Sequence, residues 1–207
     1  MTGDTPIVFV VDDDISVRES LELLIRCEGW SVEIFASAQE FLMRPLAAIP
    51  SCLVLDVSLP GINGLELQQR VAAERVWMPI IFITGHGDVP MSVQAMKAGA
   101  VEFLTKPFPD HALVSAVRQA LERSRSALAR ELERRAIRDC YAALTRRERQ
   151  VLALVVSGRL NKQIAGELDL NEVTVKAHRG RVMRKMRANS LAELVQMVAK
   201  LDLSAHA

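Results

Sequence analysis

Three carboxylates, one hydroxyl and one ammonium group each lie at the end of a short apolar segment of the sequence: Asp12, Asp13, Asp56, Thr84 and Lys106. The segments cover residues 7–11, 52–55, 80–83 and 101–104. Each is rich in β-branched side chains and bounded by polar or turn residues, which is typical of a buried parallel strand. Because ligands of an open α/β sheet bind beyond the carboxyl ends of its strands, we expect these five groups to converge on one site.

The expected site has the composition of a magnesium-dependent phosphoryl-transfer centre. Carboxylates that lie this close together repel one another unless a hard cation joins them, and Mg²⁺ prefers carboxylate and water oxygens. The lysine and the hydroxyl would bind an oxyanion beside the metal. We therefore expect Asp12, Asp13 and Asp56 to hold Mg²⁺, and phosphoryl chemistry to take place on one of these aspartates.

Two alternatives remain open at this site. Asp14 extends the acidic pair to three, and it would either join the metal ligands or cap a helix that begins at Ile15. The same carboxylates would also suit a magnesium-dependent phosphatase or a nucleotide-binding α/β enzyme. No glycine-rich phosphate loop follows the segment at 7–11, which argues against nucleotide binding.

The net charge of +1 conceals an acidic first half and a basic second half. Residues 1–117 carry 15 acidic and 7 basic side chains, whereas residues 144–207 carry 6 acidic and 12 basic ones. This polarity indicates a nucleic-acid partner for the second half alone, and a solvated surface is the alternative reading.

Hydropathy and cysteine content favour a cytoplasmic protein without a membrane partner. No apolar run approaches the ~18 residues of a membrane span, and no basic segment followed by an apolar one indicates a signal peptide. Cys27, Cys52 and Cys140 are odd in number and irregularly spaced. We expect them to be small buried hydrophobic residues in a reducing compartment.

Helical patterns alternate with the apolar segments through the first half of the chain. They cover residues 15–28, 38–44, 64–73 and 89–98, and a fifth begins at Asp110. This last pattern continues through Leu121, Leu128 and Leu132 without a glycine or proline, which predicts a long, charged linker helix. A short coiled coil is the alternative, but Arg135 occupies a position where a heptad would require an apolar residue.

The last third of the chain reads as a bundle of four short helices. Thr145 and Glu148 have capping-box spacing, and Asn161 and Asn171 are candidate caps of the next two helices. On the third helix one stripe is apolar and consists of Val175, Val182 and Met186. The opposite face is small or basic and consists of Lys176, Ala177, Gly180, Arg181, Arg184 and Arg187. His178 and Arg179 flank the apolar stripe, which favours internal hydrogen bonds for both.

Residues 5–122 resemble the receiver domain of two-component response regulators, and ITGHGDVPMSVQAMKAGAVEFLTKPF is especially similar to the FixJ branch. The resemblance implies a flavodoxin-like fold with a five-stranded parallel sheet of order 2-1-3-4-5. It implies that Asp56 accepts phosphate from a histidine kinase, and that Mg²⁺ is held by Asp12, Asp13, Asp56 and the backbone carbonyl of Ser58. It further implies that Thr84 and Lys106 complete the site, that the bond before Pro107 is cis, and that Phe103 is an aromatic switch.

The string LTRRERQVLALVVSGRLNKQIAGELDLNEVTVKAHRGRVMRKMRANS closely resembles the LuxR-type helix-turn-helix. This resemblance implies that Lys176 and Ala177 touch base edges, with Thr174, Arg181 and Arg184 as further DNA contacts. Gly180 departs from the longer side chain that some relatives carry. We accordingly divide the chain into a receiver at 1–122, a helical linker at 123–143 and a DNA-binding domain at 144–207.

Together the two resemblances imply a transcriptional response regulator of the FixJ/NarL type rather than an enzyme that turns over a substrate. A sensor histidine kinase would phosphorylate Asp56, and the phosphorylated chain would dimerise on an inverted repeat in promoter DNA and act on RNA polymerase. A regulator that binds DNA constitutively, with the receiver as a docking module, is a further reading that the complete acidic set disfavours.

Overall fold

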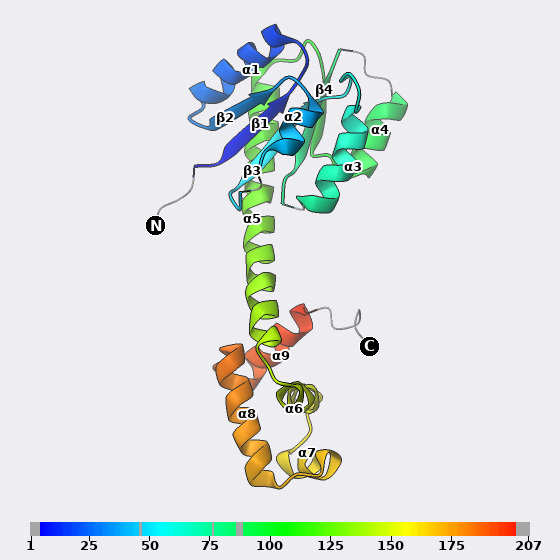
Figure 1. Ribbon diagram of the computed structural model, residues 1–207. Coiled ribbons are helices and arrows are strands. Elements are labelled where there is room, and N and C mark those ends of the chain that lie inside the picture. Colours follow the sequence, from blue (N-terminus) through cyan, green and yellow to red (C-terminus); the bar gives the residue numbers. More distant parts are fainter. Residues whose placement is uncertain (1–4, 46, 76, 86–88, 202–207) are drawn as a thin grey trace. The chain divides into compact units, whose positions relative to one another are not determined.

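The computed structural model describes residues 5–45, 47–75, 77–85 and 89–201 (Figure 1). The chain divides into two compact units, residues 1–129 and 130–207. One helix, α5, runs from Asp110 to Ala142 and contributes residues to both units, as the unbroken pattern of the sequence predicted.

The first unit is built on a five-stranded parallel sheet with the order β2-β1-β3-β4-β5, which confirms the predicted topology. Every residue of the two strands β3 and β4 is buried, because helices cover both faces of the sheet. The strands are β1 (Ile7–Val11), β2 (Ser31–Phe35), β3 (Ser51–Asp56), β4 (Ile80–Thr84) and β5 (Glu102–Thr105).

Two apolar cores lie on the two sides of this sheet. Alternate strand residues point to opposite faces, so Val8 and Val10 enter one core while Phe9 and Val11 enter the other. The first core is closed by α1 and α5, and the second by α2, α3 and α4 (Figure 1). The remaining helix bounds are α1 (Ile15–Cys27), α2 (Ala38–Met43), α3 (Gly64–Glu74) and α4 (Val89–Lys97).

Polar caps fix where the helices begin, and one of them confirms the capping role that the sequence suggested for Asp14. The Asp14 side chain accepts a hydrogen bond of 2.8 Å from the backbone N–H of Ser16, so Asp14 is the N-cap of α1.

The two leucines of α5 whose spacing suggested a heptad, Leu121 and Leu128, are both buried in this unit.

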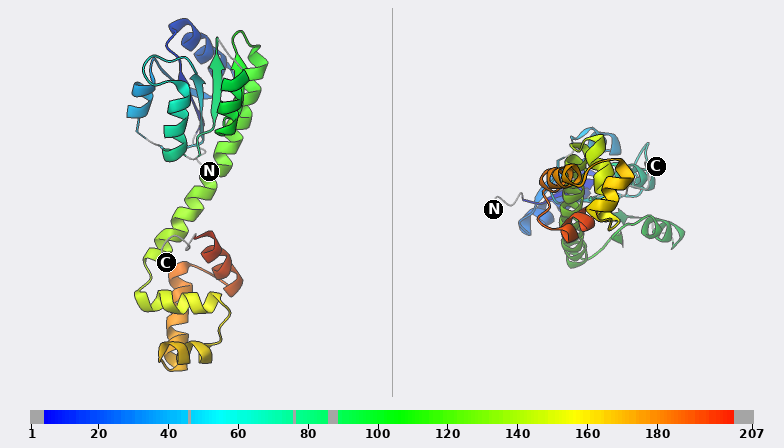
Figure 2. Two further views of the ribbon diagram at one scale, coloured as in Figure 1. Left: turned by 90° about the vertical axis from the view of Figure 1, so that its right-hand side faces the viewer. Right: turned by 90° about the horizontal axis from the view of Figure 1, so that it is seen from below.

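The second unit contains α6 (Arg146–Val156), α7 (Asn161–Leu168), α8 (Glu172–Met186) and α9 (Leu191–Lys200) together with the end of α5 (Figure 2, yellow-green to red). Its core includes Val151 and Leu152 from α6, Ile164 from α7 and Leu194 from α9. Ile137 on α5 is 4% exposed and belongs to this same core. The linker helix is therefore partly a structural element of the second unit.

Two expectations about single residues were wrong. Asn161 is not the cap of α7, because the N-cap is Leu160, whose N–H is bound by the Gln163 side chain at 2.8 Å. Asn161 instead accepts a hydrogen bond from Arg179 on α8. Cys27 is exposed, although Cys52 is buried as expected, because Cys27 lies about 200° around α1 from the buried Ile25.

Candidate functional site

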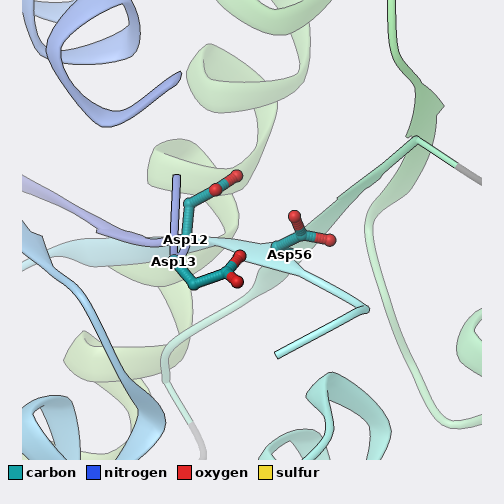
Figure 3. A group of neighbouring side chains, drawn as sticks. All are labelled: Asp12, Asp13 and Asp56. Carbon is teal, nitrogen blue, oxygen red and sulfur yellow. The ribbon is translucent and has the colours of Figure 1, made fainter. Parts of the chain in front are cut away.

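The carboxylates of Asp12, Asp13 and Asp56 meet at the carboxyl ends of β1 and β3 (Figure 3). One oxygen of each lies within 4.8 Å of the others. Asp12 and Asp56 are buried, whereas Asp13 is exposed. The convergence follows from the sheet, because β1 and β3 are neighbours in parallel register and both end at this edge.

Lys106 joins the two buried carboxylates. Its Nζ lies 2.7 Å from Oδ2 of Asp12 and 2.9 Å from Oδ2 of Asp56. The lysine follows β5, and the peptide bond to Pro107 is cis, as the resemblance implied. The backbone N–H of Lys106 donates to the carbonyl of Thr84 at 2.7 Å, which fixes the lysine to the end of β4.

Backbone groups hold the other oxygens of the two buried carboxylates. Oδ1 of Asp12 accepts from the N–H of Asp14 at 2.9 Å, and Oδ1 of Asp56 accepts from the N–H of Ser58 at 3.0 Å. The guanidinium of Arg18 donates to the backbone carbonyl of Asp12 at 2.6 Å. Sequence reasoning did not single out Arg18, whose position one turn into α1 is the signal that it can reach back to the loop after β1.

The electrostatics of the site favour an added cation. Burial raises the pKa of Asp12, and the hydrogen bonds from Lys106 and from the N–H of Asp14 offset this only in part. Burial also acts to lower the pKa of Lys106, but its bonds to Asp12 and Asp56 outweigh that effect and raise it. A charged lysine therefore pairs with two of the three carboxylates, Asp12 and Asp56. Three oxygen donors with one balancing cation are a set that fits Mg²⁺.

Space beside Asp56 is restricted by the start of α3. A Cβ atom on Gly64 would lie 2.6 Å from the backbone oxygen of Asp56 and 2.9 Å from Cα of Val57. Only glycine allows α3 to begin this close to the end of β3, and the backbone around Asp56 is held in place as a result.

The two remaining predicted residues of this unit lie on β4 and β5. Thr84 is fully buried and is the last residue of β4, at the same edge as the carboxylates. Phe103 on β5 is partly buried and packs against Phe82, with ring centroids 6.2 Å apart. Thr84 thus ends its strand at this edge of the sheet, and its role at the site, like the switching role of Phe103, stays a prediction.

The second unit presents an exposed, largely basic face on α8. Val175, Val182 and Met186 are fully buried, which confirms the predicted inward stripe. The opposite face carries the predicted contacts Lys176, Ala177, Arg181 and Arg184, all exposed, together with the exposed Gly180 and Arg187. Thr174 is half-buried in the first turn, where its N–H donates to the Asn171 side chain at 2.7 Å.

Three polar contacts fix α8 and α7 within this unit. Arg179 donates to Asn161 at 3.0 Å, which confirms its predicted internal role, and Arg147 donates to the carbonyl of Leu168 at 2.6 Å. Lys185 lies 2.7 Å from the buried carboxylate of Glu148, which the sequence had marked only as part of a capping box. The half-buried His178 has no hydrogen-bond partner for Nδ1 among the residues that the structure describes.

These two arrangements define the class of the protein. Residues 8–118 match the response regulator receiver domain, and residues 142–198 match the bacterial regulatory proteins of the luxR family. The chain belongs to the response regulators that join a receiver domain to a LuxR-type DNA-binding domain.

Particular relatives agree with this class along nearly the whole chain. Nodulation protein W of Bradyrhizobium diazoefficiens is 52% identical over 202 residues, which are 97% of this chain and 88% of that protein. The transcriptional regulatory protein FixJ of the same species is 42% identical over 196 residues, covering 95% of this chain and 96% of that protein. Among solved structures, the response regulator StyR has a TM-score of 0.81 at 49% identity, covering 95% of this chain and all of StyR.

Full-length FixJ from B. japonicum covers 96% of this chain and 98% of the FixJ chain, with a TM-score of 0.56 and 41% identity. The family assignment and the receiver fold predicted from the sequence are thus confirmed. The protein is a two-component response regulator that binds DNA and regulates transcription. Among the described residues, no helix is long and apolar enough to span a membrane.

Proposed function

We propose that Asp56 accepts a phosphoryl group from the phosphohistidine of a sensor kinase. The observation that carries this proposal is the position of Asp56 at the end of the buried strand β3, beside two further carboxylates and in contact with the ammonium group of Lys106. Asp12 is fully buried, whereas 6% of Asp56 is exposed, so Asp12 is less accessible as an acceptor.

Asp12, Asp13 and Asp56, with the backbone carbonyl of Ser58, would hold Mg²⁺. When bound, the ion neutralises charge on the transferring group and orients it. Lys106 and the Thr84 hydroxyl would bind the remaining phosphoryl oxygens, since Thr84 ends β4, which is the neighbour of β3, and Lys106 follows β5, the strand beyond β4. The acceptor is itself consumed by the reaction, so we propose a single phosphoryl transfer to each chain and no turnover of a small-molecule substrate.

Phosphorylation would be relayed from Asp56 to the surface of the receiver. The phosphorylated side chain would carry about −2 charges, roughly one more negative charge than the aspartate before the transfer. Thr84 would move towards it, and Phe103, which is partly buried next to β4, would follow. We propose that the altered face of α4, β5 and α5 favours a homodimer, which presents two α8 helices to an inverted repeat about one helical turn apart.

In the DNA-binding unit, Lys176 and Ala177 would reach base edges, while Thr174, Arg181 and Arg184 would contact the backbone or guanine. The exposure of Lys176, Ala177, Arg181 and Arg184 on the outer face of α8 supports this assignment for these four residues. We further propose that the protein acts in the cytoplasm, where its kinase, promoter DNA and RNA polymerase are available to it.

Intact-mass measurement with acetyl phosphate and Mg²⁺ tests the acceptor. The wild-type chain should gain one phosphoryl group, and Asp56→Asn should gain none. Asp13→Ala should lose labelling that depends on the metal. Asp14→Asn is the matched control, because asparagine preserves the cap of α1 and labelling should be unchanged. Undiminished labelling of Asp56→Asn would refute the proposal.

A further inference from the structure

The outer face of α8 carries a line of apolar or small residues that no fold contact explains. Val173, Ala177 and Gly180 are spaced four and three residues apart, so at about 100° per residue they lie on one narrow stripe. Val173 is 78% exposed, more than any other large hydrophobic side chain among the described residues of the second unit.

Folding of the second unit does not require the residues of this line. A β-branched side chain in the exposed first turn of a helix adds no packing and has a lower helix propensity than alanine. Gly180 lies inside α8 without a positive φ, and a Cβ atom built on it would meet nothing within 4 Å. Alanine would suit the helix better at this position.

Exposed cations border the line on both sides. Lys176 is about 60° to one side of Val173 around the helix, and Arg181 is about 80° to the other. An apolar strip between two cations is complementary to the major groove, where phosphates form the rims and the C5-methyl of thymine is an apolar group on the floor. Ala177 and Gly180 keep the strip low enough for the helix to approach the bases closely.

We propose that Val173 determines specificity by contacting the C5-methyl group of a thymine in each half-site. The proposal rests on the DNA binding of the LuxR-type unit and names a residue that is not among the DNA contacts assigned above. The N-terminal residues of a recognition helix are those that contact base edges, and Val173 is the second residue of α8. Its side chain offers no hydrogen bond, so a methyl group is the base feature it can recognise.

The test pairs a protein variant with a DNA variant. The wild-type full-length chain first selects its preferred site from a random DNA library, and each thymine of that site is then replaced by deoxyuridine, which lacks the methyl group. Replacement at the contacted position should weaken wild-type binding about fourfold, the effect of losing one buried methylene-sized contact. Val173→Ala should weaken binding to the thymine site by at least as much, and deoxyuridine should then add no further loss.

A control variant separates loss of the contact between Val173 and thymine from a general loss of folding or DNA binding. Leu132→Ala, which truncates another exposed apolar residue of this unit, is the matched control and should leave binding to both DNAs unchanged. The proposal would be overturned if Val173→Ala weakened binding by the same factor on thymine DNA and on deoxyuridine DNA, each compared with the wild-type chain on the same DNA. No loss on either DNA, or a selected site without thymine, would also overturn it. Failure of the wild-type chain to select any site would instead refute DNA recognition itself.

Discussion

Truncation of Ile137 should destabilise the DNA-binding unit, although this residue belongs to the linker helix α5. Ile137 is 4% exposed and packs in the core of the second unit. Replacing a buried isoleucine with alanine costs about 2–5 kcal/mol. Ile137 also lines a hollow of about 310 Å³ beside Met186 and Met197, where water can occupy part of the lost volume. We therefore expect the lower half of this range, about 2–3 kcal/mol.

Urea and thermal denaturation of a fragment spanning residues 130–207 measure this effect. For a domain of 60–100 residues each kcal/mol shifts Tm by about 4–8 °C, so Ile137→Ala should lower Tm by about 8–24 °C. Leu132→Ala is the control, because Leu132 is 48% exposed, and it should change Tm little. A fragment that begins at residue 144 should be less stable than one that begins at residue 130. Equal effects of the two substitutions, or equal stability of the two fragments, would refute the placement of this helix end in the core.

Two further substitutions test the second unit and the acidic site. The hydrogen bond from Lys185 is the largest cause, and that from the N–H of Thr145 the second, that lowers the pKa of Glu148 from its ordinary 4.5 to about 2. The ionised Glu148 therefore stabilises the fold fully above pH 4.5, and this stabilisation is lost as the pH falls towards 2. Glu148→Gln should cost about 1–3 kcal/mol at pH 7. The difference from wild type in urea denaturation should shrink between pH 5 and pH 2, and a constant difference would contradict the ion pair. Gly64→Ala places a Cβ atom against the Asp56 backbone, so it should destabilise the receiver by about 1–3 kcal/mol and slow its labelling by acetyl phosphate. Gly99→Ala is the control, because Gly99 has a positive φ but is remote from Asp56 in sequence. It should lower stability while the folded fraction is labelled normally.

The acidic site could be predicted closely from the sequence because buried parallel strands are recognisable as short apolar runs. The carboxyl ends of these strands then meet at one edge of the sheet. This rule alone predicts that one site contains Asp12, Asp56 and Lys106. The capping box of Thr145 and Glu148 was equally local and was confirmed. Such features depend on residues near one another in sequence or on a regular topology.

Contacts between distant side chains were not predictable in the same way. Nothing in the sequence pairs Glu148 with Lys185, because their meeting depends on how α6 and α8 pack. Asn161 has the composition of a cap, yet its oxygen binds Arg179 eighteen residues later. Cys27 shows the same limit, since membership of an amphipathic helix does not decide which face a residue occupies. Tertiary packing overrode the local preference of Asn161, whereas Glu148 keeps its capping box and adds a distant partner.

The DNA affinity of the full-length chain with and without beryllofluoride and Mg²⁺ tests the central claim most directly. Beryllofluoride on Asp56 mimics the phosphoryl group, and salt concentration is held constant because phosphate contacts depend on it. The account predicts that activation strengthens binding to the selected site in the wild-type chain and has no effect in Asp56→Asn. Unchanged affinity in the wild-type chain, or an equal response of Asp56→Asn, would contradict it.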